Sequence, residues 1–313
     1  MPHWVERLPA SAARRVKAEG PELPTLRSIL WRIFLNEDVN FLVTNRIPRR
    51  LATLAMGRFA RVESPTLARL SIAVWSLFAD DLRLEEAKES TFPSLHACFV
   101  RELREGARPI DRDTGVLVSP CDAVVGAFGR VEGTRVFQAK GFPYTLSDFF
   151  GDEDLVERHR DGLYVTLRLK SNMYHRFHAP DDAFVESVRY VSGDTWNVNP
   201  VALARVEKLF CKNERAIVEL RLGEGSSLSL AAVASILVGS VRVHAARRTF
   251  DLRYRGPHRV DCGGVHVRRG QELGYFESGS TIVLFARGPF EFARGLRTGA
   301  TIRVGEALLR RRS

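Results

Sequence analysis

From Val116 onward the chain consists of short runs of apolar and β-branched residues separated by Gly, Asp and Pro. The clearest runs cover residues 163–169, 216–222, 236–243, 265–268 and 281–285. β-Branched side chains suit a pleated sheet, and closely spaced turn residues are typical of antiparallel strands. The pattern predicts an antiparallel sandwich or barrel, interrupted by a short helix near residues 200–210.

The preceding zone, residues 25–105, has helical rather than β texture. Ile47, Leu51 and Leu54 recur at helical spacing, and no acidic residue occurs from residue 41 to residue 62. This predicts a basic amphipathic helix that Pro65 stops or restarts, followed by an apolar stretch over residues 67–78. The predicted fold class is therefore α+β. A helical N-terminal region, residues 1–105, is carried by a β-rich core, residues 106–313, that resembles a sandwich or barrel.

Charge and hydropathy restrict the partners and the location. The 313 residues carry a formal net charge of +10 with a pI near 9.9, which favours an anionic partner. The N-terminus lacks the apolar core of a secretory signal. The longest nearly apolar run, residues 70–79, is shorter than the ~20 residues that span a bilayer. We therefore expect that this chain is not an integral membrane protein. Nucleic acid is disfavoured because aromatic residues are not interleaved with the basic ones.

Metal and disulfide chemistry find little support in the sequence. The four cysteines, Cys98, Cys121, Cys211 and Cys262, form no C-x-x-C pair, so we predict neither a zinc site nor a disulfide framework, and a reducing compartment. His175 and His178 are close enough to share a metal, but no neighbouring Asp, Glu or Cys completes a ligand set. The expectation is that no metal is bound.

Three short segments carry residues that could perform chemistry together. Gly279-Ser280-Thr281 precedes an apolar strand, Asp122 lies at the edge of another, and His178 follows His175. Each segment alone has an ordinary reading as a turn, a cap or a structural side chain. Together, Ser, His and Asp can supply a nucleophile, its base and an orienting carboxylate. The G-x-S-x-G elbow of many serine hydrolases is missing. The residues by themselves therefore predict a possible Ser/His/Asp site but do not indicate which reaction it catalyses.

Many motifs in one order resemble the phosphatidylserine decarboxylase family. The likeness runs from about residue 41 to residue 308. Its markers are Phe99-Val-Arg-Glu-Leu-Arg104, Arg108-Pro-Ile-Asp111, Ser119-Pro-Cys-Asp122, Gln138-Ala-Lys-Gly141, Tyr144-Thr-Leu146, Tyr174-His-Arg-Phe-His178, Gly193-Asp194, Val198-Asn199, Leu209-Phe-Cys-Lys-Asn-Glu-Arg215, Val238-Gly-Ser240 and Gly279-Ser-Thr281.

The resemblance implies a self-cleaving proenzyme. Ser280 would attack the carbonyl of Gly279, and elimination would split the chain into residues 1–279 and 280–313. Ser280 would then become a pyruvoyl group, which forms a Schiff base with phosphatidylserine and yields phosphatidylethanolamine. His178 is similar to the base of the cleavage step and Asp122 to its orienting partner, whereas His175 would handle substrate or protons. Gly279 suits the attack because it has no Cβ. Ser278 stands where the family often has Leu, which leaves the scissile bond itself unchanged.

A second Gly-Ser pair, Gly239-Ser240, is an alternative cleavage site that we reject, since it matches a family element not known for cleavage. A serine hydrolase with the same three residues stays open as a rival, as does a lipid- or nucleic-acid-binding module.

The same resemblance gives the basic helix a role at an anionic membrane surface. The expected membrane-binding residues are Arg46, Arg49, Arg50, Leu51, Leu54, Arg58 and Phe59. We expect the protein to lie peripherally on the cytoplasmic face of a bacterial cell membrane. The two cleaved chains would form a heterodimer, and two such heterodimers could associate further.

Overall fold

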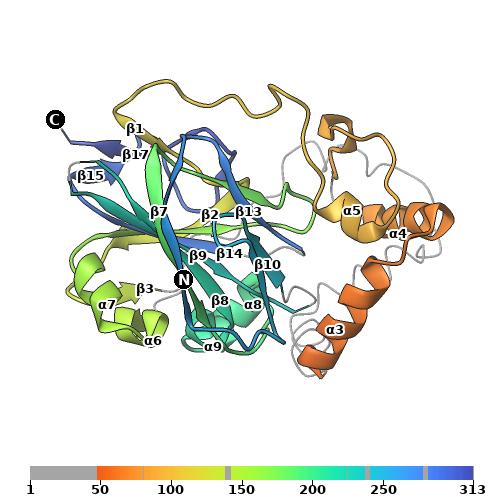
Figure 1. Ribbon diagram of the computed structural model, residues 1–313, viewed down its shortest axis with the longest axis horizontal. Helices are drawn as coiled ribbons and strands as arrows, with labels where there is room; N and C mark the ends of the chain where they lie inside the picture. Colours follow the sequence, from red (N-terminus) through yellow and green to blue (C-terminus); the bar gives the residue numbers. More distant parts are fainter. Residues whose placement is uncertain are drawn as a thin grey trace, which may run out of the picture. The chain divides into compact units, whose positions relative to one another are not determined.

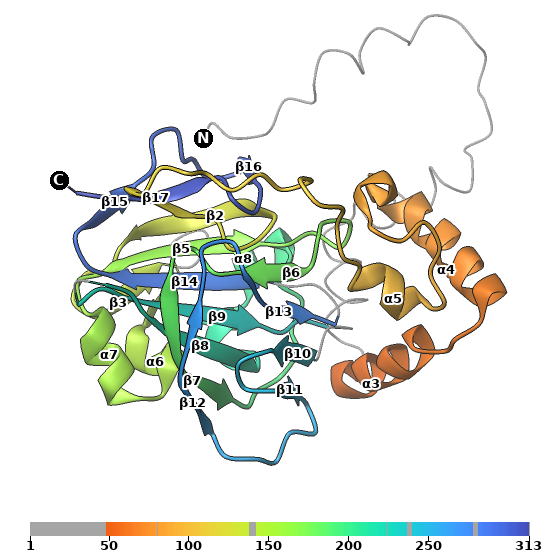
Figure 2. The same cartoon turned by 45° about the horizontal axis from the view of Figure 1, so that its top comes forward.

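A computed structural model describes residues 48–79, 81–137, 142–223, 225–236, 240–277 and 281–312. Residues 41–313 form one compact unit. Within it the described helices α3 to α5, in residues 49–99, precede the first strand, β1 (Val116–Val118), in the chain. In Figures 1 and 2 the helices of residues 48–99 lie at one end of this unit and the sheets at the other.

The helical part begins with two amphipathic helices. Helix α3 spans Arg49–Ala60 and α4 spans Pro65–Phe78, followed by the 3-10 turn η2, Leu84–Glu86, and by α5, Leu95–Phe99. Pro65 starts α4 rather than breaking it, because Ser64 caps the helix by accepting a hydrogen bond from the Leu67 backbone N–H. Helices α3 and α4 fall within the region expected to be helical, and the part of that region before residue 48 lies outside the described residues.

The core is built from antiparallel sheets, as the sequence predicts. The largest has eight strands in the order β12-β7-β8-β9-β14-β5-β2-β16, and a second has the order β11-β10-β13-β6. The strands of these two sheets are β2 (Ala123–Arg130), β5 (Leu163–Arg168), β6 (Arg176–His178), β7 (Ala183–Val191), β8 (Arg215–Arg221), β9 (Ser227–Val233), β10 (Ser240–Val243), β11 (Arg248–Asp251), β12 (Arg259–Val267), β13 (Glu272–Phe276), β14 (Thr281–Arg287) and β16 (Thr301–Ile302).

Two smaller sheets and four short helices complete the core. One small sheet has the order β1-β17-β15 and the other pairs β3 with β4. Their strands are β1 (Val116–Val118), β3 (Arg135–Phe137), β4 (Pro143–Thr145), β15 (Phe290–Phe292) and β17 (Ala307–Arg311). The helices are α6 (Leu146–Phe150), α7 (Glu153–His159), α8 (Pro200–Arg205) and α9 (Leu209–Lys212). The last two occupy the segment expected to be helical.

Both faces of the large sheet are covered, which explains the uninterrupted apolar runs in its central strands. Along β14, Ile282 and Leu284 belong to a core shared with the four-stranded sheet. Val283 and Phe285 belong to a second core, shared with helices α6 to α9. The strand has no solvent-facing side until Arg287. A segment that follows Ser280 is therefore locked into the middle of the protein.

Candidate active site

Asp122 and Thr281 lie at one end of three neighbouring strands. Thr281, the first residue of β14, pairs with Arg168 at the end of β5, and Arg168 pairs with Val124 near the start of β2. Asp122 immediately precedes β2. Although Asp122 and Thr281 are far apart in sequence, the sheet register brings them to the same end of strands β2, β5 and β14. These three strands lie side by side in Figure 2. Gly279 and Ser280 themselves lie outside the described residues.

His178 belongs to β6 and is fixed by three hydrogen bonds. Its backbone N–H donates to the carbonyl oxygen of Pro120 at 2.8 Å, which ties β6 to the segment that carries Asp122. Its Nδ1 lies 2.9 Å from the carbonyl oxygen of Gly270, and its Nε2 lies 3.1 Å from the hydroxyl of Tyr174. A carbonyl can only accept, so Nδ1 carries the proton and Nε2 presents a lone pair.

The surroundings of His178 keep its ring neutral. Burial lowers the pKa of His178, while the Gly270 carbonyl and the carboxylates of Glu272 and Asp122 partly oppose that shift. Neutral imidazole is the form that can accept a proton. The geometry therefore gives His178 the tautomer and the protonation state of a general base.

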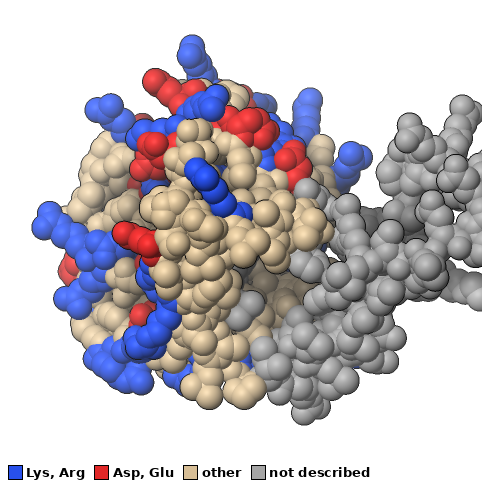
Figure 3. Space-filling view, turned by 90° about the vertical axis from the view of Figure 1, so that its right-hand side faces the viewer, with Lys and Arg blue, Asp and Glu red and all other residues tan. Residues whose placement is uncertain are grey.

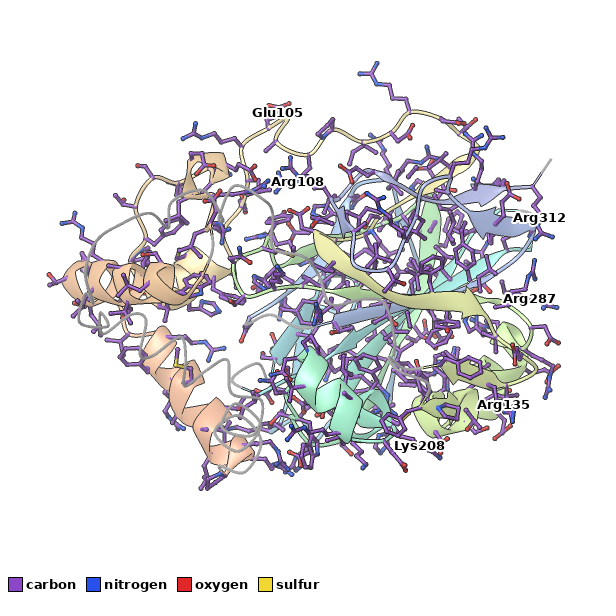
Figure 4. All side chains as sticks on the ribbon, turned by 180° about the vertical axis from the view of Figure 1, so that it is seen from behind. Glu105, Arg108, Arg135, Lys208, Arg287 and Arg312 are labelled. Atoms are coloured by element: carbon purple, nitrogen blue, oxygen red, sulfur yellow. The ribbon has the colours of Figure 1, made fainter. Side chains whose placement is uncertain are left out.

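Asp122 is held by a buried arginine. Nε and Nη2 of Arg108 donate to its carboxylate at 2.9 and 2.6 Å, and the backbone N–H of Val304 donates at 2.9 Å. Arg108 also donates to Glu86 at 2.7 Å, and it comes from the segment between the helical part and the sheets (Figure 4). Within the described residues no hydrogen bond joins Asp122 to His178. Asp122 acts on that ring through its charge, and Gly270 and Tyr174 supply the orienting hydrogen bonds.

His175 lies in an apolar recess. Its side chain is fully buried, and among the described residues neither ring nitrogen has a hydrogen-bond partner of ordinary geometry, although the Lys170 backbone acts on the ring as a weak partner. The ring stacks on Phe99 of α5 at 3.9 Å between centroids, and Phe99 in turn stacks on Trp75 of α4 at 5.6 Å. Burial and the nearby charge of Arg101 lower the pKa of His175 well below its ordinary value. Buried polar groups are normally paired, so two orphan nitrogens mark a ring suited to a ligand.

The rejected Gly-Ser pair adjoins the expected cleavage segment. The backbone N–H of Glu277 donates to the Ser240 carbonyl oxygen at 3.0 Å, and the Glu277 carboxylate pairs with Arg61 at the end of α3. The hydroxyls of Ser240 and Thr281 are buried, and no described residue forms a hydrogen bond with either of them. Gly239 lies outside the described residues. Strand pairing of β10 with β13 causes this proximity, which spacing along the chain does not reveal.

Part of the basic face of α3 points to the core. Arg49 forms a two-point ion pair with Asp194 and lies over the Trp196 ring at 3.9 Å, and Arg50 donates to the Leu252 carbonyl oxygen at 3.4 Å. Leu54 is half-buried, whereas Leu51, Arg58 and Phe59 are exposed. Arg46 lies outside the described residues. The structure thus separates the expected membrane-binding residues into core-facing and solvent-facing sets.

The exposed apolar residues of the helical part extend on to α4. Leu51 and Phe59 of α3 are followed by Leu70, Val74 and Leu77, which form one stripe of α4 and are 47–62% exposed. Figure 3 views this end of the molecule, where uncharged side chains gather in the middle and Lys and Arg lie mostly toward the margins.

Three observations concern metals, disulfides and membrane spans. No group of three His, Cys, Asp or Glu side chains in the described ranges is arranged to hold a metal ion. All four cysteines are free thiols. No helix among the described residues is long and apolar enough to cross a bilayer.

Comparison with known proteins places the chain in an enzyme class. The chain is 34% identical over 87% of its length to a decarboxylase proenzyme of Sodalis glossinidius, and it covers 95% of that protein. It is 33% identical to a Vibrio cholerae counterpart over 83% of this chain and 94% of that one. Both relatives are named phosphatidylserine decarboxylase proenzyme, so the class is that of decarboxylases made as precursors.

The family model of phosphatidylserine decarboxylase matches residues 95–310. The chain belongs to this family. Membership confirms the expectations of an enzyme, a decarboxylase, a proenzyme and a part in phospholipid metabolism.

Three residues of the site had no role in the sequence interpretation. Tyr174 and Arg108 both lie inside motifs that carry the family resemblance. For Tyr174, the four-residue spacing to His178 was a sequence signal that could have suggested contact between the two side chains. Gly270 contributes only its backbone carbonyl. A main-chain acceptor leaves no trace in sequence, so only the folded chain identifies it.

Proposed function

We propose that this chain decarboxylates phosphatidylserine to phosphatidylethanolamine after cutting itself between Gly279 and Ser280. The observation that carries the proposal is the neutral, half-buried His178, whose backbone N–H binds Pro120 in the segment that carries Asp122. That segment leads into β2 at the end that lies level with Thr281. A serine hydroxyl is a weak nucleophile that needs such a base.

The residues of the site suit a pyruvoyl group at position 280. That group would condense with the substrate amine and act as an electron sink while CO2 leaves. Around it the chain supplies the neutral ring of His175, whose unpaired nitrogens can bind or transfer a substrate proton. Phe99 and Trp75 wall that ring with apolar surface, and a dry site favours loss of a charged carboxylate.

Lipid access is assigned to the exposed stripe of α3 and α4. Leu51, Phe59, Leu70, Val74 and Leu77 would enter the acyl boundary, with the exposed Arg58 and Arg69 near anionic headgroups. Because Trp75 of α4 stacks on Phe99 beside His175, a protein docked in this way holds its active site next to the bilayer. The proposed location is therefore peripheral, on the cytoplasmic face of the membrane.

The test is the intact mass of the purified chain under denaturing conditions, together with its activity. We expect two fragments, 1–279 and 280–313, the shorter one starting with a blocked pyruvoyl group that borohydride reduces. Ser280→Ala should give one uncut, inactive chain, and Ser278→Ala is the matched control that should still be cut. An uncut wild-type chain that hydrolyses esters would instead favour a serine hydrolase. A longer C-terminal fragment beginning at Ser240 would move the cleavage site.

A further inference from the structure

A pocket lies at the opposite end of β2, β5 and β14 from Thr281. Its volume is about 360 Å³. The charged side chains that line it are Arg130, Arg287, Arg312 and Asp161. Strand register brings the first two together, because Arg130 pairs with Leu163 across β2 and β5, and Leu163 pairs with Ala286 across β5 and β14. Arg287 is the next residue of β14, so the two arginines lie at one end of three neighbouring strands.

The arginines of this pocket carry more charge than the described carboxylates balance. The guanidinium group of Arg130 forms no hydrogen bond or ion pair with any described residue. That of Arg287 donates through Nη1 to the main-chain carbonyl oxygen of Arg160 at 2.8 Å. Arg312 lies 4.0 Å from Glu291, and both side chains are about half exposed, so this ion pair is weak. The pocket therefore has an excess of positive charge, and a bound anion would relieve the repulsion between its arginines.

The two turns beside the pocket hold its arginines on a fixed frame. Asp161 has a φ of +57°, which is uncommon for a residue with a side chain, and its carboxylate accepts a hydrogen bond from the Gly133 backbone N–H at 2.8 Å. On the other side, Gly288 has a φ of +147°, a conformation that favours glycine. The next residue, Pro289, accepts a hydrogen bond from the backbone N–H of Arg312 at 2.7 Å. A frame fixed in this way lowers the cost of ordering the site around a ligand.

We propose that this pocket binds a small soluble phosphate ester or diphosphate. The planar guanidinium group matches phosphate oxygens through two parallel N–H···O bonds, and a phosphate could join Arg130 to Arg287 in this way. The pocket has the size of a small-molecule site, roughly 300–1,000 Å³, so an organic group or a second phosphate can accompany the first. Leu163 and Phe290, which are 4% and 2% exposed, offer apolar surface to that remainder.

The position of the pocket separates this ligand from the lipid substrate. Figure 4 shows Arg287 and Arg312 at the end of the molecule remote from α3 and α4. A bilayer that contacts the exposed apolar stripe of those helices would therefore not reach the pocket, whereas a soluble anion would. The choice of a soluble ligand rests on the docking proposed above. The binding of an anion does not, and it requires neither self-cleavage nor decarboxylation.

The test is isothermal titration calorimetry of the full chain with inorganic pyrophosphate in phosphate-free buffer. We expect saturable binding at one site. Arg130→Gln and Arg287→Gln should each weaken it at least about tenfold, as expected for losing a hydrogen bond to a charged group. Arg259→Gln is the matched control, because Arg259 is an exposed arginine of β12, which β7, β8 and β9 separate from β14. That variant should bind pyrophosphate like the wild type.

Asp161→Asn should change the affinity in the opposite direction. The amide keeps an oxygen that accepts from the Gly133 N–H, and Asn tolerates the left-handed backbone, so the turn is preserved. Removing the one carboxylate of the lining should tighten pyrophosphate binding by about threefold or more. A folding defect cannot produce tighter binding. The site is overturned by a wild type that shows no saturable binding, by an equal loss in Arg259→Gln, or by a folded Asp161→Asn chain that binds no more tightly.

Sedimentation with vesicles of phosphatidylcholine and phosphatidic acid distinguishes a soluble ligand from a headgroup. Arg130→Gln and Arg287→Gln should pellet with these vesicles like the wild type. Loss of vesicle binding in both variants, without pyrophosphate binding by the wild type, would identify a lipid headgroup and overturn the proposal. An uncut, inactive wild-type chain that still binds pyrophosphate would overturn the proposed function and leave this site in place.

Discussion

Burial gives the histidines of this protein their chemical character. His178 keeps one lone pair because Gly270 fixes its tautomer, and His175 stays neutral because its recess contains aromatic rings rather than carboxylates. At the residue scale, two histidines of one short motif therefore differ in environment: His178 is hydrogen-bonded at both ring nitrogens, whereas His175 is enclosed by aromatic rings.

Self-cleavage should lose rate only in acid. Burial lowers the pKa of His178, and the charge of Arg176 adds to this shift, while Gly270 and the carboxylates of Glu272 and Asp122 partly oppose it. The ring is therefore neutral at any pH above about 6.5, the ordinary pKa of histidine. We expect a rate that is flat from about pH 6.5 to 8 and falls at lower pH, as the folded-state pKa is reached. The same shift stabilises the fold above about pH 6.5, and this contribution is lost on acidification. A cutting rate with a midpoint above 6.5 in pulse-chase experiments would contradict the assignment.

Asp122→Asn should weaken both the fold and maturation. Asp122 and Arg108 are each 8% exposed, and Asp122 also accepts from Val304, so the substitution leaves a buried guanidinium with Glu86 as its remaining carboxylate. Breaking a buried pair costs about 3–5 kcal/mol. Urea unfolding should show a loss of this order, with slower cutting. Glu86→Gln, which changes a more exposed carboxylate, should lower the free energy of unfolding clearly less than Asp122→Asn. Equal losses for the two variants would contradict this prediction.

At the element scale, the same sequence pattern serves two purposes in α3. Its arginines are spaced as a solvated basic face, yet Arg49 and Arg50 dock against Asp194 and Leu252 of the core. The apolar residues Leu51 and Phe59 are the ones left in solvent. In most helices of globular proteins such apolar side chains face the core. In α3 they are exposed because the face that carries Arg49 makes the tertiary contacts.

Val74→Glu should impair vesicle binding. Val74 is 47% exposed in the α4 stripe, and burying a Val side chain contributes about 1.5–3 kcal/mol, so losing it and adding a charge should lower affinity at least about tenfold. The assay is sedimentation with anionic vesicles at low and high salt, with weaker binding expected at high salt. Val265→Glu is the control, since Val265 is 45% exposed on β12. Equal losses for both variants, or binding that ignores lipid charge and salt, would exclude α4 as the contact.

At the scale of the whole molecule, the proposed cut falls where the fold can tolerate it. Strand β14 starts at Thr281, lies between β5 and β9, and has six buried residues in succession. The remaining strands of the C-terminal segment, β15, β16 and β17, pair with each other or with β1 and β2. A chain cut before Thr281 therefore keeps every one of these strand pairs.

The two fragments should stay together until the protein unfolds. We expect one peak of full mass in native size-exclusion chromatography and two species only in denaturant, because separating them requires opening the centre of the large sheet. Leu284→Asp, in the middle of β14, should release the short fragment or prevent its accumulation. Spontaneous separation of wild-type fragments in native buffer would show that β14 is not held as described. Arg287 and Arg312, at the end of the molecule remote from α3 and α4, offer surface controls that should leave the association intact (Figure 4).

Much of this protein follows from local sequence. Alternating and continuous apolar runs determined the β-rich core, since side-chain periodicity decides which faces can be buried. Capping residues and Pro65 determined where α4 begins. The residue types alone indicated a Ser/His/Asp site, and the resemblance carried by the ordered motifs pointed to Asp122, His175, His178 and Ser280; their roles remain predictions.

Tertiary structure alone decided how those residues are connected. The Arg108 clamp on Asp122, the Gly270 carbonyl behind His178, and the proximity of Ser240 to Glu277 join segments that are 14 to 92 residues apart. The same holds for the side of α3 that faces solvent. Strand register and backbone hydrogen bonds set these contacts, and neither is encoded in the identity of any single side chain.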